Sequence, residues 1–433
     1  MVENASQING SNDANGETDS SIPPPIVGMT NTPFIPDRKE EVAMITYLED
    51  QDLGSMENHK SVIMHIISQL KDGKDLTKIV LPTFILEQRS LLEMFADYNA
   101  HPQMLIDVTN GPTPHERMKS FVKWFLTAFH ASKKDKVAKK PYNPIIGEIF
   151  QCSWRLSPSS SQNKIIDGQE VEDGGSTAGE EPILLTYIGE QVSHHPPVSA
   201  FQICCPSRRL QLVGAVHTAS HFRGLSIFVN FVGKVVLKLG EHDEEYVFAL
   251  PTAYGRSILT VPWFELGDTI TIECPQSGYK THVKFHTKTV TNNKRLHQIS
   301  ADIFAPGTPQ NTKNAVVSVT GHWNSTMEFV DHISGTKEVI DTNKLEVEPK
   351  WVRPVTLQEP EESQRLWFNV TTALRQSNID LATQEKTQLE EVQRVSEKAR
   401  TSKNLPHIPR FFKETADGYI FVDPTEEKDE TLQ

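Results

Sequence analysis

The sequence lacks features that define several protein classes. Its 433 residues include only four cysteines, and their spacing is too irregular for a disulfide framework or a zinc knuckle. We expect Cys152, Cys204, Cys205 and Cys274 to be reduced, buried and inert. No apolar run approaches the roughly 18 residues that span a bilayer, and the N-terminus lacks the pattern of a signal peptide. These absences indicate a soluble, cytosolic chain.

An excess of positive charge is also missing. The chain has 43 Lys and Arg against 56 Asp and Glu, which excludes a strongly basic, indiscriminate nucleic-acid binder. The acidic residues are concentrated in three segments. Residues 1–60 carry 11 acids and 3 bases, residues 157–182 carry 6 acids and 1 base, and residues 423–433 carry 5 acids and 1 base. The rest of the chain is therefore mildly basic.

Composition predicts one folded domain between two tails. Residues 1–55, rich in Asn, Ser, Gly, Pro and acids, are expected to form a disordered acidic and polar tail, and 423–433 a second acidic tail. The folded domain then covers 56–422. Within it, 156–182 lacks periodicity, interrupts two strands and is typical of a surface insertion.

Helical apolar spacing occurs near both ends of this domain. The predicted helices are Ser61–Leu70, Thr83–Ala96, His115–His130, Glu361–Leu374 and Thr383–Thr401. The first is amphipathic, and two interpretations of it stay open: an ordinary helix packed on the core, or a mobile flap with one apolar side.

Between these helical regions the apolar period changes to two, which is typical of strands. We predict strands at Ile149–Trp154, Ile183–Val192, Val198–Cys205, Leu210–Thr218, Leu225–Val232, Lys234–Leu239, Tyr246–Leu250, Ser257–Trp263, Thr269–Cys274, Thr281–His286, Gln298–Phe304, Ala315–Trp323 and Met327–Val330, with a short closing strand within Pro409–Val422. So many sequential strands indicate an antiparallel meander that closes to remove its edges. The predicted fold is mainly β (α+β), a large, nearly complete antiparallel β-barrel with room for a ligand.

The most unusual segment is Glu190–Pro197, EQVSHHPP. Adjacent histidines on an ideal strand point to opposite faces, but the two prolines end the strand, so His194 and His195 can converge on one ligand. Other interpretations are two surface histidines, a zinc site, or a hydrolase in which Ser193 and His194 act as nucleophile and base. The zinc site lacks HExxH, CxxC and a histidine at i+4, and the serine lacks GxSxG.

A lysine run precedes the first long strand and enters the sequence KPYNPIIGE. Such runs are usually solvated faces, but the Pro-Tyr-Asn-Pro turn fixes the backbone direction. Lys140 and Asn143 would then present a cation and an amide at a barrel rim, which suits a phosphate and an ester carbonyl. The run consists of Lys133, Lys134, Lys136, Lys139 and Lys140.

Lys386, Glu390 and Arg394 share one face of the last helix. The ordinary explanation is an exposed face with ion pairs worth about 0.3–0.5 kcal/mol each. Alternatively, Lys386 and Arg394 face an anion while Glu390 orients one of them. The imidazole and basic groups together suit a phosphomonoester, which carries about −1.5 to −2 charges at pH 7.

EQVSHHPP resembles, without mismatch, the signature of the oxysterol-binding-protein-related family of lipid transfer proteins. The likeness covers about Glu57–Val422. The segments KKPYNPIIGEIFQCSW, TAYGRSILTVPWFELG and GHWN, with the TxxKxxxE register around Lys386, are most similar to the animal subgroup of related proteins nine, ten and eleven.

The resemblance implies a barrel around an apolar lipid tunnel, with an N-terminal lid at about 57–84 and flanking C-terminal helices at about 361–401. It implies exchange of phosphatidylinositol 4-phosphate for a second lipid between membranes. The implied headgroup contacts are His194 and His195 to the 4-phosphate, Lys140 and Asn143 to the phosphoryl and glycerol region, and Lys386, Glu390 and Arg394 completing the site. In phosphatidylserine carriers the equivalents of Leu81 and Ser220 contact that lipid.

The resemblance implies no enzyme activity, no cofactor, and no catalytic or metal residue. Phosphatidylserine is the expected second lipid and sterol the alternative, and a non-transporting lipid sensor stays open. The expected location is the cytosol, with peripheral, transient contact with anionic membrane surfaces at organelles or contact sites.

Two features depart from the larger relatives. From its length we expect the chain to have no room for their pleckstrin-homology module. Thr46–Asp52 (TYLEDQD) is similar to the acidic motif that docks to an endoplasmic-reticulum receptor, although Leu48 and Asp50 replace expected residues. Receptor docking and hetero-dimerisation therefore stay open.

Overall fold

The computed structural model describes residues 41–44, 86–130, 140–157, 165–166, 169–170, 182–223, 226–257, 263–288, 295–416 and 418–423. The predicted lid, with Ser61–Leu70 and Leu81, lies outside the described residues. So do Thr46–Asp52, most of both tails and most of the insertion 156–182.

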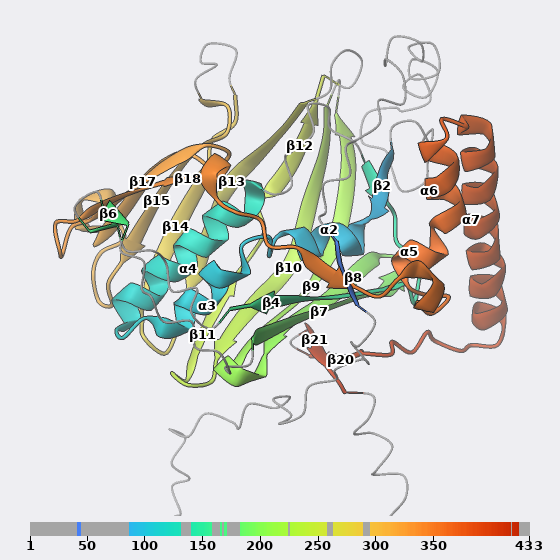
Figure 1. The fold of residues 1–433 in the computed structure, drawn as a ribbon, viewed down its shortest axis with the longest axis horizontal. Coiled ribbons are helices and arrows are strands. Elements are labelled where there is room, and N and C mark those ends of the chain that lie inside the picture. The colour runs from blue at the N-terminus through green and yellow to red at the C-terminus, as the bar shows by residue number, and fades with distance from the viewer. Residues whose placement is uncertain are drawn as a thin grey trace, which may run out of the picture.

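Among the described residues, fifteen strands form one large sheet (Figure 1). Every pairing in it is antiparallel, so the predicted mainly β fold with a large antiparallel sheet is confirmed. Its order is β1-β19-β4-β7-β8-β9-β10-β11-β13-β14-β15-β16-β17-β18, with β12 between β10 and β13. The strands are β1 (Val42–Met44), β4 (Ile149–Leu156), β7 (Ile183–His194), β8 (Pro197–Cys205), β9 (Leu210–Arg223), β10 (Ser226–Leu239), β11 (Glu244–Phe248), β12 (Thr252–Arg256), β13 (Trp263–Glu273), β14 (Lys280–Phe285), β15 (Gln298–Phe304), β16 (Val317–His322), β17 (Thr326–Asp331), β18 (Lys337–Asp341) and β19 (Lys350–Val352).

Within the described ranges, three strand pairs lie outside this sheet. They are β2 (Leu86–Ser90) with β3 (Lys140–Tyr142), β5 (Ile165–Ile166) with β6 (Gln169–Glu170), and β20 (Phe412–Thr415) with β21 (Gly418–Phe421). The closing strand predicted near the C-terminus is therefore a hairpin, whose strand β21 contacts β8 and β9.

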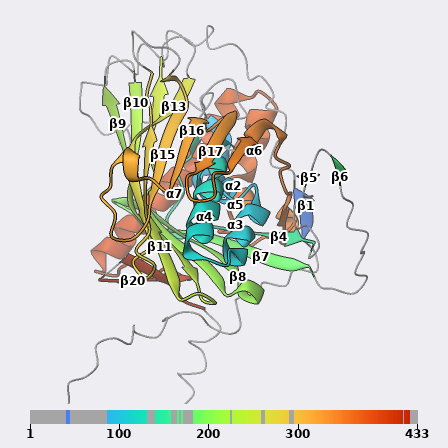
Figure 2. The same cartoon turned by 90° about the vertical axis from the view of Figure 1, so that its left-hand side faces the viewer.

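The helices form two groups, α2 to α4 inside the curve of the sheet and α5 to α7 along its edge (Figures 1 and 2). Their bounds are α2 (Leu91–Asp97), α3 (Pro102–Asn110), α4 (Pro114–Ala128), α5 (Ser363–Leu366), α6 (Phe368–Arg375) and α7 (Ile379–Ser402). Short 3-10 helices are η5 (Pro206–Arg208), η7 (Thr312–Asn314), η8 (Thr342–Lys344) and η9 (Val355–Leu357).

Aromatic packing holds α4 against the inner face of the sheet. The ring of Phe121 stacks on Tyr246 at 5.0 Å, and Phe125 meets Phe248 edge to face at 5.4 Å. Arg117 adds a buried ion pair, because its Nε and Nη2 atoms donate to Glu244 at 2.8 and 2.7 Å. The helix thus fills one end of the space that the sheet encloses.

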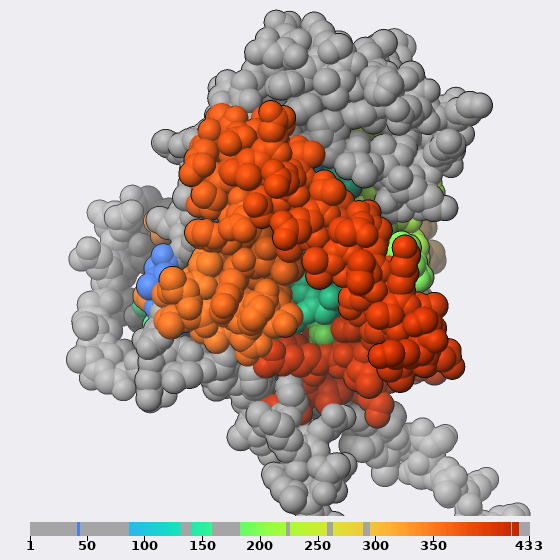
Figure 3. All heavy atoms as spheres, turned by 90° about the vertical axis from the view of Figure 1, so that its right-hand side faces the viewer, coloured from blue at the N-terminus to red at the C-terminus, as the bar shows by residue number. Residues whose placement is uncertain are grey.

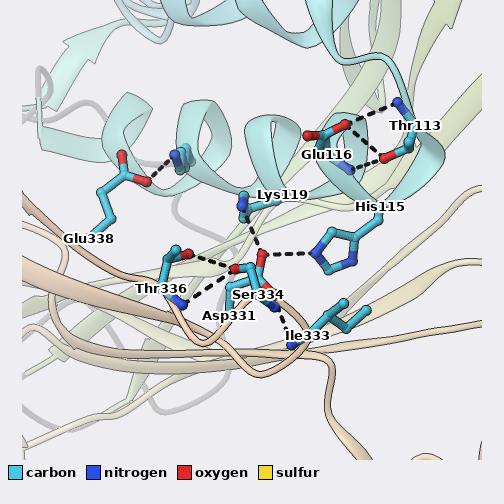
Figure 4. Close-up of polar contacts among 10 residues, drawn as sticks. Thr113, His115, Glu116, Lys119, Asp331, Ile333, Ser334, Thr336 and Glu338 are labelled. Atoms are coloured by element: carbon cyan, nitrogen blue, oxygen red, sulfur yellow. Dashed lines mark hydrogen bonds and ion pairs between the residues drawn. The ribbon is translucent and has the colours of Figure 1, made fainter. Parts of the chain in front are cut away.

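A carboxylate ties the same helix to the turn after β17 (Figure 4). Asp331 accepts hydrogen bonds from Lys119 at 2.8 Å, from His115 at 2.9 Å and from the backbone N–H of Ser334 at 3.2 Å. Burial alone raises the pKa of Asp331, but the bonds from Lys119 and His115 prevail and lower it well below its usual range.

Several sequence predictions were wrong in detail. The helix predicted over Thr83–Ala96 is confirmed only in its second half, which belongs to α2; Leu86–Ser90 is strand β2, because these residues pair with β3. Most of the strand predicted at Ser257–Trp263 lies outside the described residues; β12 ends at Arg256 before it, and β13 begins at Trp263. Residues 42–44, assigned to the disordered tail, form β1 by pairing with β19. Helix α3 and strands β18 and β19 were not predicted.

Two predicted strands, Leu225–Val232 and Lys234–Leu239, are one continuous strand, β10. Gly233 joins them with φ 152°, and a Cβ atom there would lie 2.1 Å from the carbonyl oxygen of Ala215. Only glycine allows that close approach of two backbones, so its presence marks a tight pairing rather than a turn.

The cysteines are free thiols, as expected, although Cys204 is half-buried rather than buried. Burial raises the pKa of the Cys204 thiol to about 12 and also raises the pKa of Cys205 and Cys274. The reactive thiolate form is therefore scarce at neutral pH.

Candidate functional site

The two adjacent histidines lie where β7 ends and the chain turns into β8. A register shift between Gln191 and Ser193 changes the alternation just before them, and His194 pairs with Pro197. As a result the Nδ1 atoms of His194 and His195 lie 3.3 Å apart. The fold therefore brings together two side chains that a regular strand would point in opposite directions.

Asn143 approaches the pair from the loop that follows β3. Its Nδ2 atom lies 3.4 Å from Nε2 of His194. Lys140, three residues earlier, is a half-buried residue of β3 and pairs with Leu86 of β2. The turn after the lysine run thus places the amide of Asn143 beside His194. The lysines of the run before Lys140, within Lys133–Lys139, fall outside the described residues.

Helix α7 lies beside the histidines and contributes a residue that sequence reasoning missed. Oε1 of Glu397 lies 3.0 Å from Nδ1 of His195. Glu397 follows Arg394 by one turn, so it extends the stripe that begins at Lys386 and Glu390. This spacing was the available signal, but nothing in the sequence placed the stripe against the histidines.

The predicted trio on α7 divides into two ion pairs. Nζ of Lys386 pairs with Glu390, and the Lys386 side chain is only 12% exposed. Arg394 pairs instead with Glu391 at 2.8 Å and is 49% exposed, so Glu390 orients the lysine alone. The arginine is held by a weak surface contact that a ligand can replace.

Burial and then repulsion from His195 lower the pKa of His194, against the opposite influence of Glu397 and Glu390. Both carboxylates are thus close enough to act on this imidazole. His194 is therefore predominantly neutral at pH 7.

A pocket of about 330 Å³ opens beside the histidines, on the outer side of the sheet. Helix α7 and the residues after it form its other wall, and Figure 3 shows that these red C-terminal residues lie exposed on this side of the molecule. Titratable or polar lining residues are Ser193, His194, His195, Glu397, Arg400, Thr401, His407, Glu414 and Tyr419. The pocket combines imidazoles, two carboxylates and a guanidinium, a suitable set for a polar ligand.

Ser220 lies apart from these groups, on the inner wall of the sheet. It pairs with Val229 of β10, on the same face as Phe231, whose ring lies 6.2 Å from that of Phe95 in the core. Ser220, Val229 and Phe231 are half-buried, unlike the fully covered side chains of Val235 and Leu237 further along β10. This end of the inner wall combines apolar side chains with the hydroxyls of Ser220 and Thr218 and is less tightly covered than Val235 and Leu237. Leu81, its predicted companion, lies outside the described residues.

In the described part of the chain, no helix combines the length and apolarity needed to cross a bilayer.

Comparison with known sequences finds relatives over most of the chain. The sequence model of a family described as "Oxysterol-binding protein" matches residues 65–373 and 369–431. The chain is 46% identical over 384 residues to human oxysterol-binding protein-related protein 10, covering 87% of this chain and 49% of that one. It is 47% identical over 387 residues to the mouse oxysterol-binding protein-related protein 11, covering 87% and 51%. The chain therefore spans about half the length of these relatives.

Solved structures share the fold. The crystal structure of the Osh1 ORD domain in complex with ergosterol matches with a TM-score of 0.64 and 19% identity, covering 91% of this chain and 92% of that one. The Osh3 ORD from Saccharomyces cerevisiae in complex with PI(4)P matches with a TM-score of 0.61 and 18% identity, covering 91% and 97%.

Proposed function

Because the chain belongs to the oxysterol-binding protein family, and is similar to related proteins nine, ten and eleven, we propose that it is a lipid carrier. Members of this family bind and transfer lipids and are not enzymes. We propose that this chain extracts phosphatidylinositol 4-phosphate from one membrane and exchanges it for a second lipid, phosphatidylserine, at another.

The observation that carries the proposal is the meeting of His194 and His195 with Asn143 and with helix α7. A phosphomonoester has three acceptor oxygens and needs donors from several directions. The exposed histidine ring, the amide of Asn143 and the guanidinium of Arg394 supply such donors from three separate elements. Lys140 and Lys386 add cationic charge for the phosphoryl groups, with Glu390 orienting Lys386.

The apolar inner wall supports a lipid as the ligand. Moving a diacyl lipid through water exposes its methylene groups at about 0.8 kcal/mol each, so a carrier has to shield the acyl chains. The half-buried residues Val229 and Phe231 provide such a surface. We propose that residues 57–84, including Leu81, close over the chains as a lid.

The identity of the second lipid rests on Ser220. Hydroxyls on the inner wall beside Val229 and Phe231, those of Ser220 and Thr218, suit the polar backbone of a glycerophospholipid, which favours phosphatidylserine. Sterol is the alternative, since the Osh1 ORD domain, which shares this fold, was solved with ergosterol. A sterol would make fewer headgroup contacts and leave Ser220 without a role.

We propose that delivery involves transient, peripheral contact with anionic membranes from the cytosol. The segment after α7 supports this, because Leu405 and Ile408 are 56% and 82% exposed. Arg400, Lys403 and Arg410 flank them, and a basic residue near an anionic surface contributes about 1 kcal/mol. Apolar side chains surrounded by basic ones are typical of surfaces that rest on such membranes.

Lipid that co-purifies with the chain tests the proposal. We expect native mass spectrometry to detect a phosphatidylinositol monophosphate or phosphatidylserine, and purified protein to move both lipids between two liposome populations in opposite directions. A chain that binds lipid but transfers none would be a sensor, and a chain with sterol alone would favour the alternative cargo.

A further inference from the structure

We propose that His194, His195 and Glu397 form a binding site for a divalent transition-metal ion of the zinc type. Each residue offers one ligand atom, and these atoms all lie within 4.8 Å of one another. Two ligands come from the end of β7 and the third from α7, two hundred residues later in the sequence. This third ligand is what the local sequence around the histidines lacks.

The atoms that face one another here have more lone pairs than protons. Nδ1 of His195 lies 3.3 Å from Nδ1 of His194 and 3.0 Å from Oε1 of Glu397. A neutral imidazole carries a single N–H, and an ionised carboxylate carries none. A single N–H on Nδ1 of His195 therefore has to be shared between Glu397 and His194. A metal ion satisfies all three atoms at once, because each then gives a lone pair to one centre.

The spacing and the ligand types fit zinc. Zn–N bonds of about 2.0–2.1 Å in tetrahedral geometry separate neighbouring ligand atoms by about 3.3 Å. The separations of 3.3 and 3.0 Å at His195 lie close to that value. Two imidazoles with one carboxylate favour zinc or copper over magnesium or calcium, which prefer oxygen ligands.

Asn143 occupies the place of an outer-shell partner. A metal-ligating histidine usually donates its other ring N–H to an oxygen that fixes the ring. Nδ2 of Asn143 lies 3.4 Å from Nε2 of His194, and the amide oxygen faces the ring when the amide is turned by half a rotation. Nδ1 of His194 is then left free to bind the metal.

Substitution of Glu397 distinguishes a metal site from a site that binds phosphate directly. A carboxylate repels a phosphate, so removing its charge strengthens a phosphate site but weakens a metal site. Three protein ligands also leave one tetrahedral position open to water or to a phosphate oxygen. Metal binding does not require the proposed lipid function, and it is measured on lipid-free protein, so either proposal can fail without the other.

Equilibrium dialysis of the full chain against ZnCl2 tests the site. We expect one zinc ion to bind and its affinity to fall by more than about tenfold in Glu397→Gln and His195→Ala, since even loss of an outer-shell partner costs about 10–100-fold. Glu391→Gln, an acid 59% exposed on the same helix, is the matched control and should bind as the wild type does.

A spectroscopic measurement adds a readout of the ligands themselves. With Cu²⁺ in place of zinc, electron paramagnetic resonance should show hyperfine splitting from two nitrogens in the wild type and from fewer in His195→Ala. His195 and Glu397 are 67% and 37% exposed, so these substitutions should leave the circular dichroism spectrum unchanged. The proposal would be overturned if the wild type bound no zinc, or if Glu397→Gln bound zinc with the affinity of the wild type.

Discussion

The carboxylate of Glu190 accepts a hydrogen bond from the backbone N–H of Phe411 at 2.8 Å. Its other oxygen accepts the N–H of Arg410 at 2.7 Å. Glu190 is the first residue of the octapeptide that ends with the histidines and prolines, and it is 1% exposed. It therefore fixes the segment between α7 and β20, one wall of the pocket, to the strand that carries His194.

Replacing Glu190 by Gln should loosen that segment. One acceptor becomes an amide donor facing a backbone N–H, and a buried polar group left unpaired costs about 1–3 kcal/mol. A cost of this size makes the opened state of the segment about 5 to 150 times more populated. Hydrogen exchange of residues 403–412 measures this, with Glu414→Gln, an exposed acid on β20, as the control. Equal exchange in both variants would show that Glu190 does not hold the segment.

Replacing Leu405 and Ile408 together by Asp should weaken membrane binding. Each change removes part of the roughly 1.5–3 kcal/mol that burial of such a side chain provides, so we expect a loss of at least about tenfold. Flotation with phosphatidylserine-containing vesicles measures it. Ile333→Asp is the matched control, because Ile333 is 66% exposed at the turn after β17. A similar loss in the control would mean that apolar exposure alone, and not this segment, governs binding.

Replacing Asp331 by Asn should destabilise the protein in a pH-dependent way. The lowered pKa of Asp331 means that its stabilisation is present above about pH 4, the unfolded value, and is lost as pH falls through the folded value. We expect a loss of about 2–3 kcal/mol at pH 7, because charged hydrogen bonds to Lys119 and His115 are removed, and a smaller difference at pH 3.

Urea unfolding at both pH values measures this change. Glu338→Gln serves as the control, since Glu338 is 49% exposed and pairs with Lys123 on the same helix (Figure 4). Its substitution should alter the free energy of unfolding by less than about 1 kcal/mol. A difference for Asp331→Asn that is independent of pH would contradict the assigned ionisation.

Alternating apolar residues predicted most strands of the sheet, because burial of one face imposes that period. The pattern failed where tertiary pairing decides the structure. Leu86–Ser90 was assigned to a helix but pairs with β3, and the short apolar run at Val42–Met44 pairs with β19 although residues 1–55 as a whole are polar. Strand β18, with three of its five residues exposed, offers no apolar alternation to detect.

The candidate site was predictable in part for a similar reason. Prolines next to His194 and His195 indicated an unusual strand end, and the helical stripe of Lys386, Glu390 and Arg394 was visible as a spacing. The contact of Glu397 with His195, by contrast, depends on how α7 packs against the end of β7. Side chains some two hundred residues apart carry no local signal of their meeting.

The central claim is that the histidine end of β7 recognises the phosphate of a phosphoinositide. Extraction of phosphatidylinositol 4-phosphate from liposomes by the purified chain tests it most directly. We predict that His194→Ala combined with His195→Ala abolishes extraction without altering the fold. The control is His332, an exposed histidine that follows β17 and contacts Ser318. The His332→Ala variant should extract the lipid as the wild type does. Unchanged extraction by the double variant would contradict the claim.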